Sequence, residues 1–237
     1  MIGIIGALHV EVDILIAKLI NVQKRTISGR DYYSGNLGGQ DVVIVECGVG
    51  KVNAAMCAQT LILAYQPELV INTGVAGGLD GNLHIGDIAV ARDLVQHDVD
   101  TTATGEPVGF VSTVDRIDFP CATWAVEKIL EAVRSQADLK GALVRIASGD
   151  QFIERREDKM RIIKQFQAGA CEMEGGAIAQ VCWINNVDCA VIRAISDAMD
   201  GEHAMEFSQF CEMAAHNSSR VLMHFLENYE KLNVICL

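Results

Sequence analysis

Residues 69–78 read Leu-Val-Ile-Asn-Thr-Gly-Val-Ala-Gly-Gly, a β-branched run followed by five small residues. The first half predicts a buried strand, because β-branched side chains pack well on a pleated sheet. The small residues after it form either a plain turn or a loop that fits closely around a ligand. We favour the ligand loop, since small side chains allow the backbone to approach a bound molecule.

Short apolar runs recur along the chain, and longer segments of helical period lie between most of them. This alternation is typical of a mainly parallel sheet flanked by helices. We expect strands over residues 2–6, 31–37, 42–47, 69–73, 87–92, 143–147 and 189–195. We expect helices over residues 10–20, 52–65, 123–136, 158–166, 175–185 and 207–231.

Gly38 and Gly39 lie between two alternating runs and predict an antiparallel hairpin, because glycine supplies the positive φ that a tight turn needs. The predicted fold is a single α/β domain over residues 1–237, with three layers, α/β/α, and a central mixed, mostly parallel β-sheet flanked by helices. Residues 100–120 carry little periodicity, and a loop of that length in a compact domain is usually functional.

The composition excludes several classes of partner. With 31 acidic and 19 basic residues, the formal net charge of -12 repels nucleic-acid phosphates and anionic lipids, so we expect neither nucleic acid nor a membrane surface as a partner. The eight cysteines form no C-x-x-C pair, which fits reduced thiols and a cytoplasmic location. The apolar N-terminus is too short for a signal peptide, and no apolar run reaches the roughly 20 residues of a membrane span.

Motifs for other chemistries are incomplete. Residues 48–53, Gly-Val-Gly-Lys-Val-Asn, lack the third glycine of a dinucleotide fingerprint and the upstream glycine and Ser/Thr of a P-loop. The six histidines show no short metal-ligand spacing, and His97 with Asp98 and Asp100 fits a loop hydrogen-bond network better than a metal site. No G-x-S-x-G elbow of a serine hydrolase is present. We therefore expect no metal and no cofactor.

Acidic residues lie close to the ends of predicted strands, where α/β sheets bind ligands. Glu11 follows the first strand, and a solvent-exposed helix charge is its plainest interpretation. Asp197 closes the buried run 189–197, which also holds Arg193, and it is either a helix cap or a catalytic group.

Two further carboxylates, Glu172 and Glu174, alternate around Met173 just before a predicted helix. The alternation puts both on one strand face, although acidic side chains also favour the N-terminus of a helix. Together with Glu11 and Asp197 they predict a carboxylate-lined pocket.

The order of these motifs resembles the 5'-methylthioadenosine/S-adenosylhomocysteine nucleosidases, of the purine nucleoside phosphorylase superfamily, nearly from end to end. The resemblance is carried by residues 4–7 followed by Glu11, and by residues 48–55, 71–74, 76–78, 86–88, 97–100, 148–153, 172–174 and 193–197.

This resemblance implies hydrolysis of the N-glycosidic bond of an adenine nucleoside with a 5'-thioether, which releases adenine and a thioribose. By position, Asp197 matches the family's general acid, which donates to adenine N7. Glu11 matches the residue that activates the attacking water, and Glu174 matches the ligand of the ribose hydroxyls. A carboxylate near the sugar also favours its cationic, oxocarbenium-like transition state.

Further residues are expected to bind the substrate. Phe152 would stack on adenine while the backbone of Ile153 reads the purine edge. Arg193 and Ser196 would support the acid and the water site. The other expected binding residues are Val75, Ala76, Gly77, Glu172 and Met173.

The sequence departs from the family pattern at two places. Val75 stands where many members have serine, and residues 102–110 lack two aromatics of the usual stretch. The family forms homodimers in which this loop, after His97, covers the partner's 5' pocket, so the resemblance implies a homodimer here. Preference for the 5' substituent is therefore the least certain property to transfer from the family.

Three alternative functions stay open. The first is hydrolysis of another 5'-modified nucleoside, of the futalosine or 5'-deoxyadenosine type, because the altered loop lies over the 5' side. The second is a purine nucleoside phosphorylase, although phosphate binding favours convergent Arg or Lys residues over an acidic base such as Glu11. The third is a non-catalytic nucleoside-binding protein on the same fold.

Overall fold

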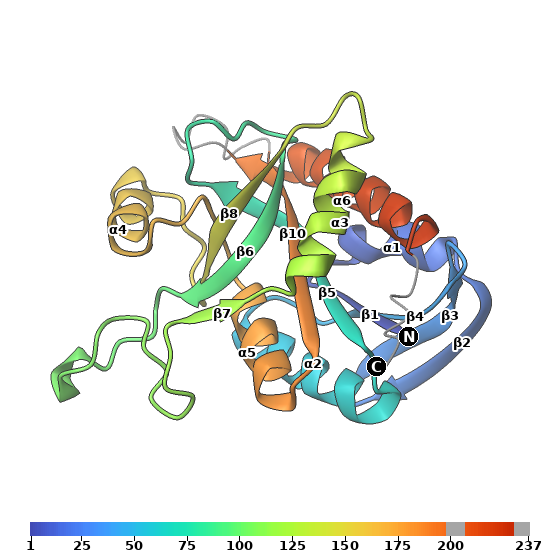
Figure 1. Ribbon diagram of the computed structural model, residues 1–237, viewed down its shortest axis with the longest axis horizontal. Coiled ribbons are helices and arrows are strands. Elements are labelled where there is room, and N and C mark those ends of the chain that lie inside the picture. Colours follow the sequence, from blue (N-terminus) through green and yellow to red (C-terminus); the bar gives the residue numbers. More distant parts are fainter. Residues whose placement is uncertain (198–206, 230–237) are drawn as a thin grey trace, which may run out of the picture.

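The computed structural model describes residues 1–197 and 207–229, and these residues form one ten-stranded mixed sheet flanked by helices (Figure 1). The strands are β1 (Ile2–Gly6), β2 (Ile20–Ile27), β3 (Arg30–Leu37), β4 (Gln40–Glu46), β5 (Leu69–Gly78), β6 (Ile88–Gln96), β7 (Asp118–Pro120), β8 (Gly141–Ser148), β9 (Ala170–Glu172) and β10 (Asp188–Asp197). The helices are α1 (His9–Ala17), α2 (Lys51–Tyr65), α3 (Thr123–Arg134), α4 (Arg156–Phe166), α5 (Gly175–Asn185) and α6 (Phe207–Glu227), with a short 3-10 turn at Thr102–Thr104.

The sheet consists of a closed ring and an open arm. The strand order is β10-β6-β8-β9-β5-β1-β4-β3-β2, and an additional pairing between β10 and β5 closes β5, β10, β6, β8 and β9 into a ring. The remaining strands β1, β4, β3 and β2 extend from β5 as an arm, and β7 pairs with β6. Strand β5 therefore belongs to both parts.

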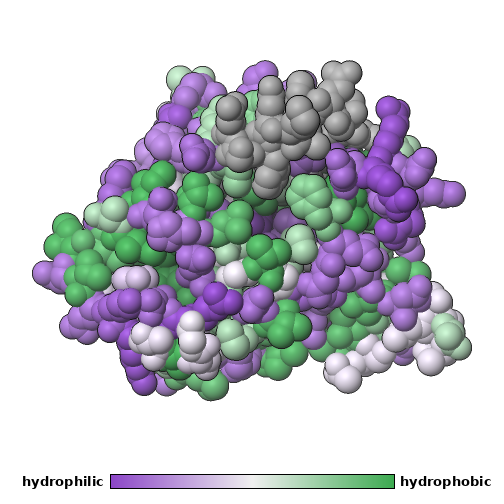
Figure 2. Space-filling model, turned by 180° about the vertical axis from the view of Figure 1, so that it is seen from behind, coloured by the Kyte–Doolittle hydropathy of each residue, from purple (hydrophilic) through white to green (hydrophobic). Residues whose placement is uncertain are grey.

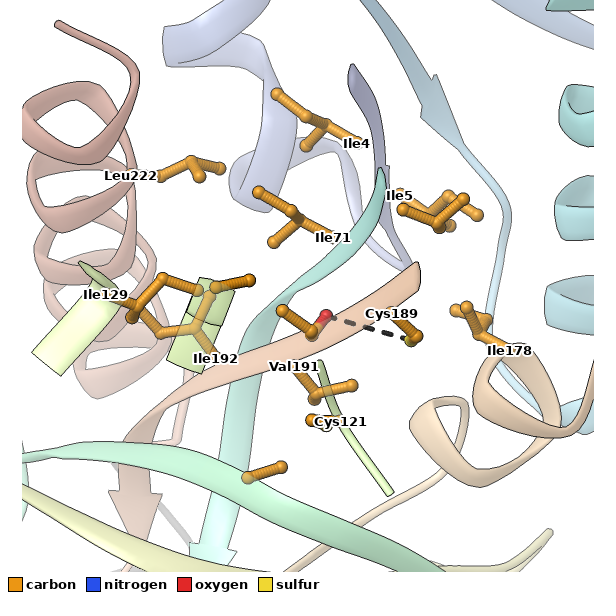
Figure 3. Close-up of a cluster of buried hydrophobic side chains, with 14 of the residues drawn as sticks. Ile4, Ile5, Ile71, Cys121, Ile129, Ile178, Cys189, Val191, Ile192 and Leu222 are labelled. Atoms are coloured by element: carbon orange, nitrogen blue, oxygen red, sulfur yellow. Dashed lines mark hydrogen bonds between the residues drawn. The ribbon is translucent and has the colours of Figure 1, made fainter. Parts of the chain in front are cut away.

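Helices cover both faces, so the three-layer α/β/α fold is confirmed. Helices α1, α3 and α6 pack together on one face, and α2 and α5 pack on the other (Figure 1). Figure 3 shows how the layers meet: Leu222 of α6 and Ile129 of α3 lie to one side of the sheet, and Ile178 of α5 lies to the other. These side chains and the alternating Ile4 and Ile5 of β1 are fully buried, each contributing roughly 1.5–3 kcal/mol by leaving water.

The mixed sheet is also confirmed, but its expected parallel majority is wrong. Among the described strands, five pairings are parallel and five are antiparallel. Closure of the ring and the hairpin arm supply the antiparallel pairings. The hairpin predicted at Gly38 and Gly39 is present between β3 and β4.

Sequence prediction misses three strands and places the ends of three helices too late. Helices α3 and α6 end at Arg134 and Glu227, before the predicted ends at residues 136 and 231. Strand β2 begins at Ile20, whereas the first helix was expected to run to that residue and in fact ends at Ala17. Strand β2 is exposed along nearly its whole length, so it has no apolar alternation to reveal it. Strands β7 and β9 have three residues each, too few for a periodic pattern. Residues 230–231 of the last predicted helix lie outside the described residues.

The structure also corrects the prediction of a ligand loop at residues 74–78. These residues continue β5 as a regular strand that pairs with β10 and β9. Residues 74–77 pair with β10, and Gly77 and Gly78 pair with β9, so the small residues stay extended and no turn forms at this point.

Hydrophilic and hydrophobic side chains are mixed over the face of the molecule seen in Figure 2. No helix in the described ranges is both long and apolar enough to cross a membrane.

Candidate active site

A cavity of about 230 Å³ opens where several strands of the sheet end. Its walls come from the segments that follow β1, β4 and β8, from the second half of β5, and from the ends of β9 and β10. Carboxyl ends of parallel strands are the usual ligand-binding edge of an α/β sheet. The cavity is therefore where the topology favours a site.

Almost all the residues predicted for the site line this one cavity. They are Glu11, Val75, Ala76, Gly77, Phe152, Ile153, Glu172, Met173, Glu174, Ser196 and Asp197. The one exception, Arg193, lies directly behind the wall, in contact with two of the carboxylates. Residues that are up to 186 positions apart in the sequence are thus brought together by the ring of strands.

Arg193 is the buried cation of the site, with 1% of its surface exposed. Its guanidinium donates to Glu172 and to the side-chain oxygen of Asn72, and lies 3.5 Å from Glu174 Oε2. A buried charge is tolerated only when it is paired and hydrogen-bonded, so these partners and Arg193 hold each other in place.

Glu11 enters the cavity from the first turn of α1. Its Oε2 accepts hydrogen bonds from the backbone N–H of Ala7 (2.7 Å) and Leu8 (2.9 Å), and its Oε1 accepts one from Val75 N–H (3.0 Å). Burial raises the pKa of Glu11, although Arg193 and these N–H groups oppose the shift. A fixed carboxylate of raised pKa suits a base that takes a proton from water.

Val75 contributes its backbone to this arrangement. The N–H group that contacts Glu11 is available whatever side chain the residue carries, so the missing serine hydroxyl leaves the contact intact. The neighbouring Gly74 has no room for a side chain, because a Cβ there would collide with Arg193 and with Glu11.

Glu174 precedes α5, and its Oε1 accepts a hydrogen bond of 2.8 Å from Gly50 N–H. Gly50 has a φ of 96°, a conformation that glycine adopts readily, at the start of α2. Burial raises the pKa of Glu174 to about 7 against the pull of Arg193, and the nearby carboxylates of Glu172 and Glu11 add to the rise.

Glu172 lines the cavity, but its oxygens are already used by the protein. Oε2 accepts from the N–H groups of Glu174 (3.0 Å) and Gly175 (2.7 Å) and from Arg193, while Ser148 donates to Oε1. Glu172 therefore caps α5 and anchors Arg193. These contacts give Glu172 a role in holding the site together, and its role as a substrate ligand stays a prediction.

Asp197 ends β10 and faces the same cavity. Lys159 Nζ lies 2.8 Å from its Oδ2, and Ser196 Oγ lies 3.4 Å from its Oδ1. Oδ1 also lies next to Gly77, where a Cβ would come within 3.1 Å of it. The partners of Asp197 thus differ from those of the other three carboxylates.

The rim of the cavity holds an aromatic side chain. Phe152 is 63% exposed and lines the opening together with the buried Ile153. An exposed ring beside a cavity offers a surface on which a planar base can stack.

Four residues that the sequence did not single out support the site. Asn72 and Ser148 contact Arg193 and Glu172, and Gly50 contacts Glu174. Lys159 contacts Asp197 from α4. Gly50, Asn72 and Ser148 lay within motifs that were considered, residues 48–53, 71–74 and 148–153, whereas Lys159 lay outside all of them.

The loop network expected around His97 is present in part. Asp98 accepts from Lys51 Nζ (2.6 Å) and from Asp150 N–H (2.8 Å), and Asp100 accepts from Thr102. Within the described residues, neither ring nitrogen of His97 has a hydrogen-bond partner.

Comparisons with known proteins agree with this geometry. The model of the phosphorylase superfamily matches residues 1–227. A 5'-methylthioadenosine/S-adenosylhomocysteine nucleosidase of Staphylococcus aureus (strain MRSA252) is 41% identical over 223 residues, which covers 94% of this chain and 97% of that protein. The chain belongs to this nucleosidase family.

The chain is similar to solved structures of two kinds of enzyme, the nucleosidases and a futalosine hydrolase. The nucleosidase of Neisseria meningitidis, in complex with methylthio-immucillin-A, matches with a TM-score of 0.92 and 33% identity, over 96% of this chain and 99% of that one. A futalosine hydrolase of Helicobacter pylori matches with a TM-score of 0.89 and 34% identity, over 96% and 97%. The family resemblance predicted from sequence is confirmed.

The raised pKa of Glu174 predicts a pH dependence of stability. The folded value of about 7 exceeds the ordinary value of 4.5, so the protonated form stabilises the fold. This contribution is fully present below about pH 4.5 and is lost as the pH rises to about 7. In urea titrations, the wild-type free energy of unfolding should fall between pH 5 and pH 8 by about 2–3 kcal/mol more than that of Glu174→Gln. The exposed control Glu127→Gln should follow the wild type, and parallel wild-type and Glu174→Gln curves would refute the assignment.

Proposed function

We propose that the protein hydrolyses the N-glycosidic bond of 5'-methylthioadenosine and S-adenosylhomocysteine, releasing adenine and the corresponding thioribose. The observation that carries this proposal is the placement of two carboxylates along β5. Glu11 accepts from Val75 N–H, and Asp197 lies beside Gly77, two residues further on. Two residues of strand span roughly 7 Å, which leaves space for a sugar and a water molecule between a base and an acid.

Departure of adenine is the step that needs the acid. The C1'–N9 bond breaks with its electron pair moving into the purine, and a proton from Asp197 neutralises the charge by forming a bond to N7. The sugar becomes oxocarbenium-like, and the negative charge of Glu174 stabilises it electrostatically.

Attack of water completes the reaction. Glu11, held by three backbone N–H groups, accepts one proton of the water as its oxygen bonds to C1'. Glu174 accepts hydrogen bonds from the ribose hydroxyls, while Phe152 stacks on adenine and the backbone of Ile153 contacts the purine edge. Met173, Ala76 and Gly77 supply the apolar and backbone walls.

Water is favoured over phosphate as the second substrate. Among the described residues that line the cavity there are four carboxylates and no Arg or Lys. Arg193 is buried behind them and already paired. A phosphate dianion would meet repulsion here, which argues against a phosphorylase.

Hydrolysis of a futalosine-type nucleoside is the second candidate. The similarity to a futalosine hydrolase supports it, and so does the altered stretch of residues 102–110. The base and ribose subsites would serve both substrates, so the difference lies at the 5' substituent.

We also propose a homodimer built on the helical layer of α2 and α5. Exposed apolar side chains gather there at Val52, Met56 and Trp183, and Val49 beside them is 45% exposed and lines the cavity. The segment between β6 and β7 extends away from the body of the fold and does not line its own cavity (Figure 1). Such a segment suits contact with a partner's 5' pocket.

Size-exclusion chromatography with light scattering tests the dimer. Val52 is 80% exposed, so Val52→Asp should leave a single chain folded but place a charge in the interface and shift the mass towards the monomer. Val22→Asp, on the exposed edge strand β2, should leave the dimer intact. A monomeric wild-type protein would refute the proposal.

The cytoplasm remains the proposed location. The cysteines in the described part of the chain are all free and buried, as expected for a reducing compartment.

Adenine release from purified protein tests the proposed function. We expect release from 5'-methylthioadenosine and S-adenosylhomocysteine at rates that phosphate does not change. Asp197→Asn should lower kcat about 10²–10⁴-fold, because an amide cannot donate the proton. Asp41→Asn, an exposed carboxylate on β4, is the matched control and should not change the rate. Release that requires phosphate would instead indicate a phosphorylase, and release from futalosine alone would indicate the second candidate.

A further inference from the structure

Lys159 occupies an apolar position of α4. The buried residues of this helix are Lys159, Ile162 and Phe166, spaced three and four residues apart on one face. Lys159 is 1% exposed, although an unpaired ammonium is among the costliest groups to bury. A lysine at such a position needs a partner that repays its desolvation.

The ammonium of Lys159 reaches the end of β10. Its Nζ lies 2.8 Å from Asp197 Oδ2, and 24% of the Asp197 side chain is exposed. Oδ1 of the same carboxylate has a weaker contact, 3.4 Å from Ser196 Oγ. Both oxygens lie beside Gly77 on the cavity wall. The two oxygens of Asp197 therefore differ in their partners: Oδ2 is held by a cation, whereas Oδ1 contacts a neutral hydroxyl.

We propose that Lys159 is a positioning residue for the general acid, fixing Oδ2 of Asp197 so that Oδ1 carries the proton to the purine. This inference rests on the proposed function, because it assigns Lys159 a role in that reaction. When the O–H bond at Oδ1 breaks and the N7–H bond forms, Asp197 becomes a carboxylate next to an ammonium. The positive charge of Lys159 stabilises the carboxylate that forms as the proton leaves. Water returns the proton to Asp197 after adenine has left.

Other titratable groups lie near Lys159 and Asp197, and their protonation also contributes to a pH profile of activity. Cys171 on β9 faces Asp197, and burial together with the Asp197 charge raises its pKa to about 12, so it remains a thiol near neutrality. Glu172 is held by Arg193, and Glu11 and Glu174 titrate on the opposite, base side of the reaction. Arg155, just before α4, pairs near the surface with Asp158 of that helix. The difference between the pH profiles of the wild type and a Lys159 variant isolates the effect of the Lys159 charge.

The sign of the expected change follows from the charge. A general acid must carry its proton to work, so adenine release is expected to fall on the alkaline side of the pH profile. Removal of the nearby cation makes the carboxylate less favourable and moves this alkaline limb to higher pH.

The experiment is a pH profile of kcat and KM for adenine release by Lys159→Met, Lys159→Arg and Lys164→Met. We expect the alkaline limb of Lys159→Met to move up by about 1 unit or more, with kcat at its plateau lowered about 10-fold and KM little changed. Lys159→Arg keeps a positive charge and should keep the limb near its wild-type position. Lys164→Met alters an exposed lysine of the same helix and should match the wild type throughout.

The same change in the Asp197→Asn background separates positioning from folding. If Lys159 acts through Asp197, Lys159→Met should cause no further loss of kcat in that background. An unmoved limb in Lys159→Met, or a full additional loss in the double variant, would overturn the inference. If Lys159→Met does not fold, the limb of Lys159→Arg decides, since its displacement by a unit or more would contradict a role for the charge. Absence of adenine release from the wild type would refute the proposed function instead.

Discussion

A buried guanidinium constrains the rest of this site. Arg193 has almost no contact with water, so its charge must be balanced by groups that the fold brings to it. Glu172 and Glu174 supply the charge, and Asn72 supplies a further acceptor. Because these groups come from β5, β9 and the start of α5, the need to pair one cation fixes where β10 lies within the ring. Position 74 must be glycine for the same reason, because a Cβ there would collide with the Arg193 guanidinium.

The four carboxylates that line the cavity have different roles because their neighbours differ. Glu172 accepts hydrogen bonds from donors of the protein itself. Glu11 is held by backbone N–H groups, and Glu174 is held by one backbone N–H group and by Arg193. Asp197 stands apart with a lysine of its own. Different surroundings separate the protonation behaviour of chemically similar groups, which is how a single cavity can hold both an acid and a base.

Sequence prediction succeeded for the elements whose burial produces a recognisable pattern of apolar residues. The core strands β1, β4, β5 and β10 were predicted, because apolar runs mark buried strands. The carboxylates Glu11 and Asp197, and Glu172 and Glu174 at and just after the end of the missed strand β9, were predicted as well. Strand β2 was missed since its exposed residues carry no such record. The strand pairing of residues 74–78, the occupation of Glu172 and the burial of Lys159 depend on contacts across the fold, which no local pattern contains.

The most direct test of this account is the specificity constant kcat/KM for adenine release by Arg193→Lys. Lysine keeps the charge but cannot contact Glu172, Glu174 and Asn72 together, so the carboxylates should lose their fixed positions. The account predicts a folded protein with kcat/KM lowered about 100-fold or more, while the exposed control Arg134→Lys keeps the wild-type value. A folded Arg193→Lys protein with nearly wild-type kcat/KM would contradict the claim that the buried guanidinium organises the site.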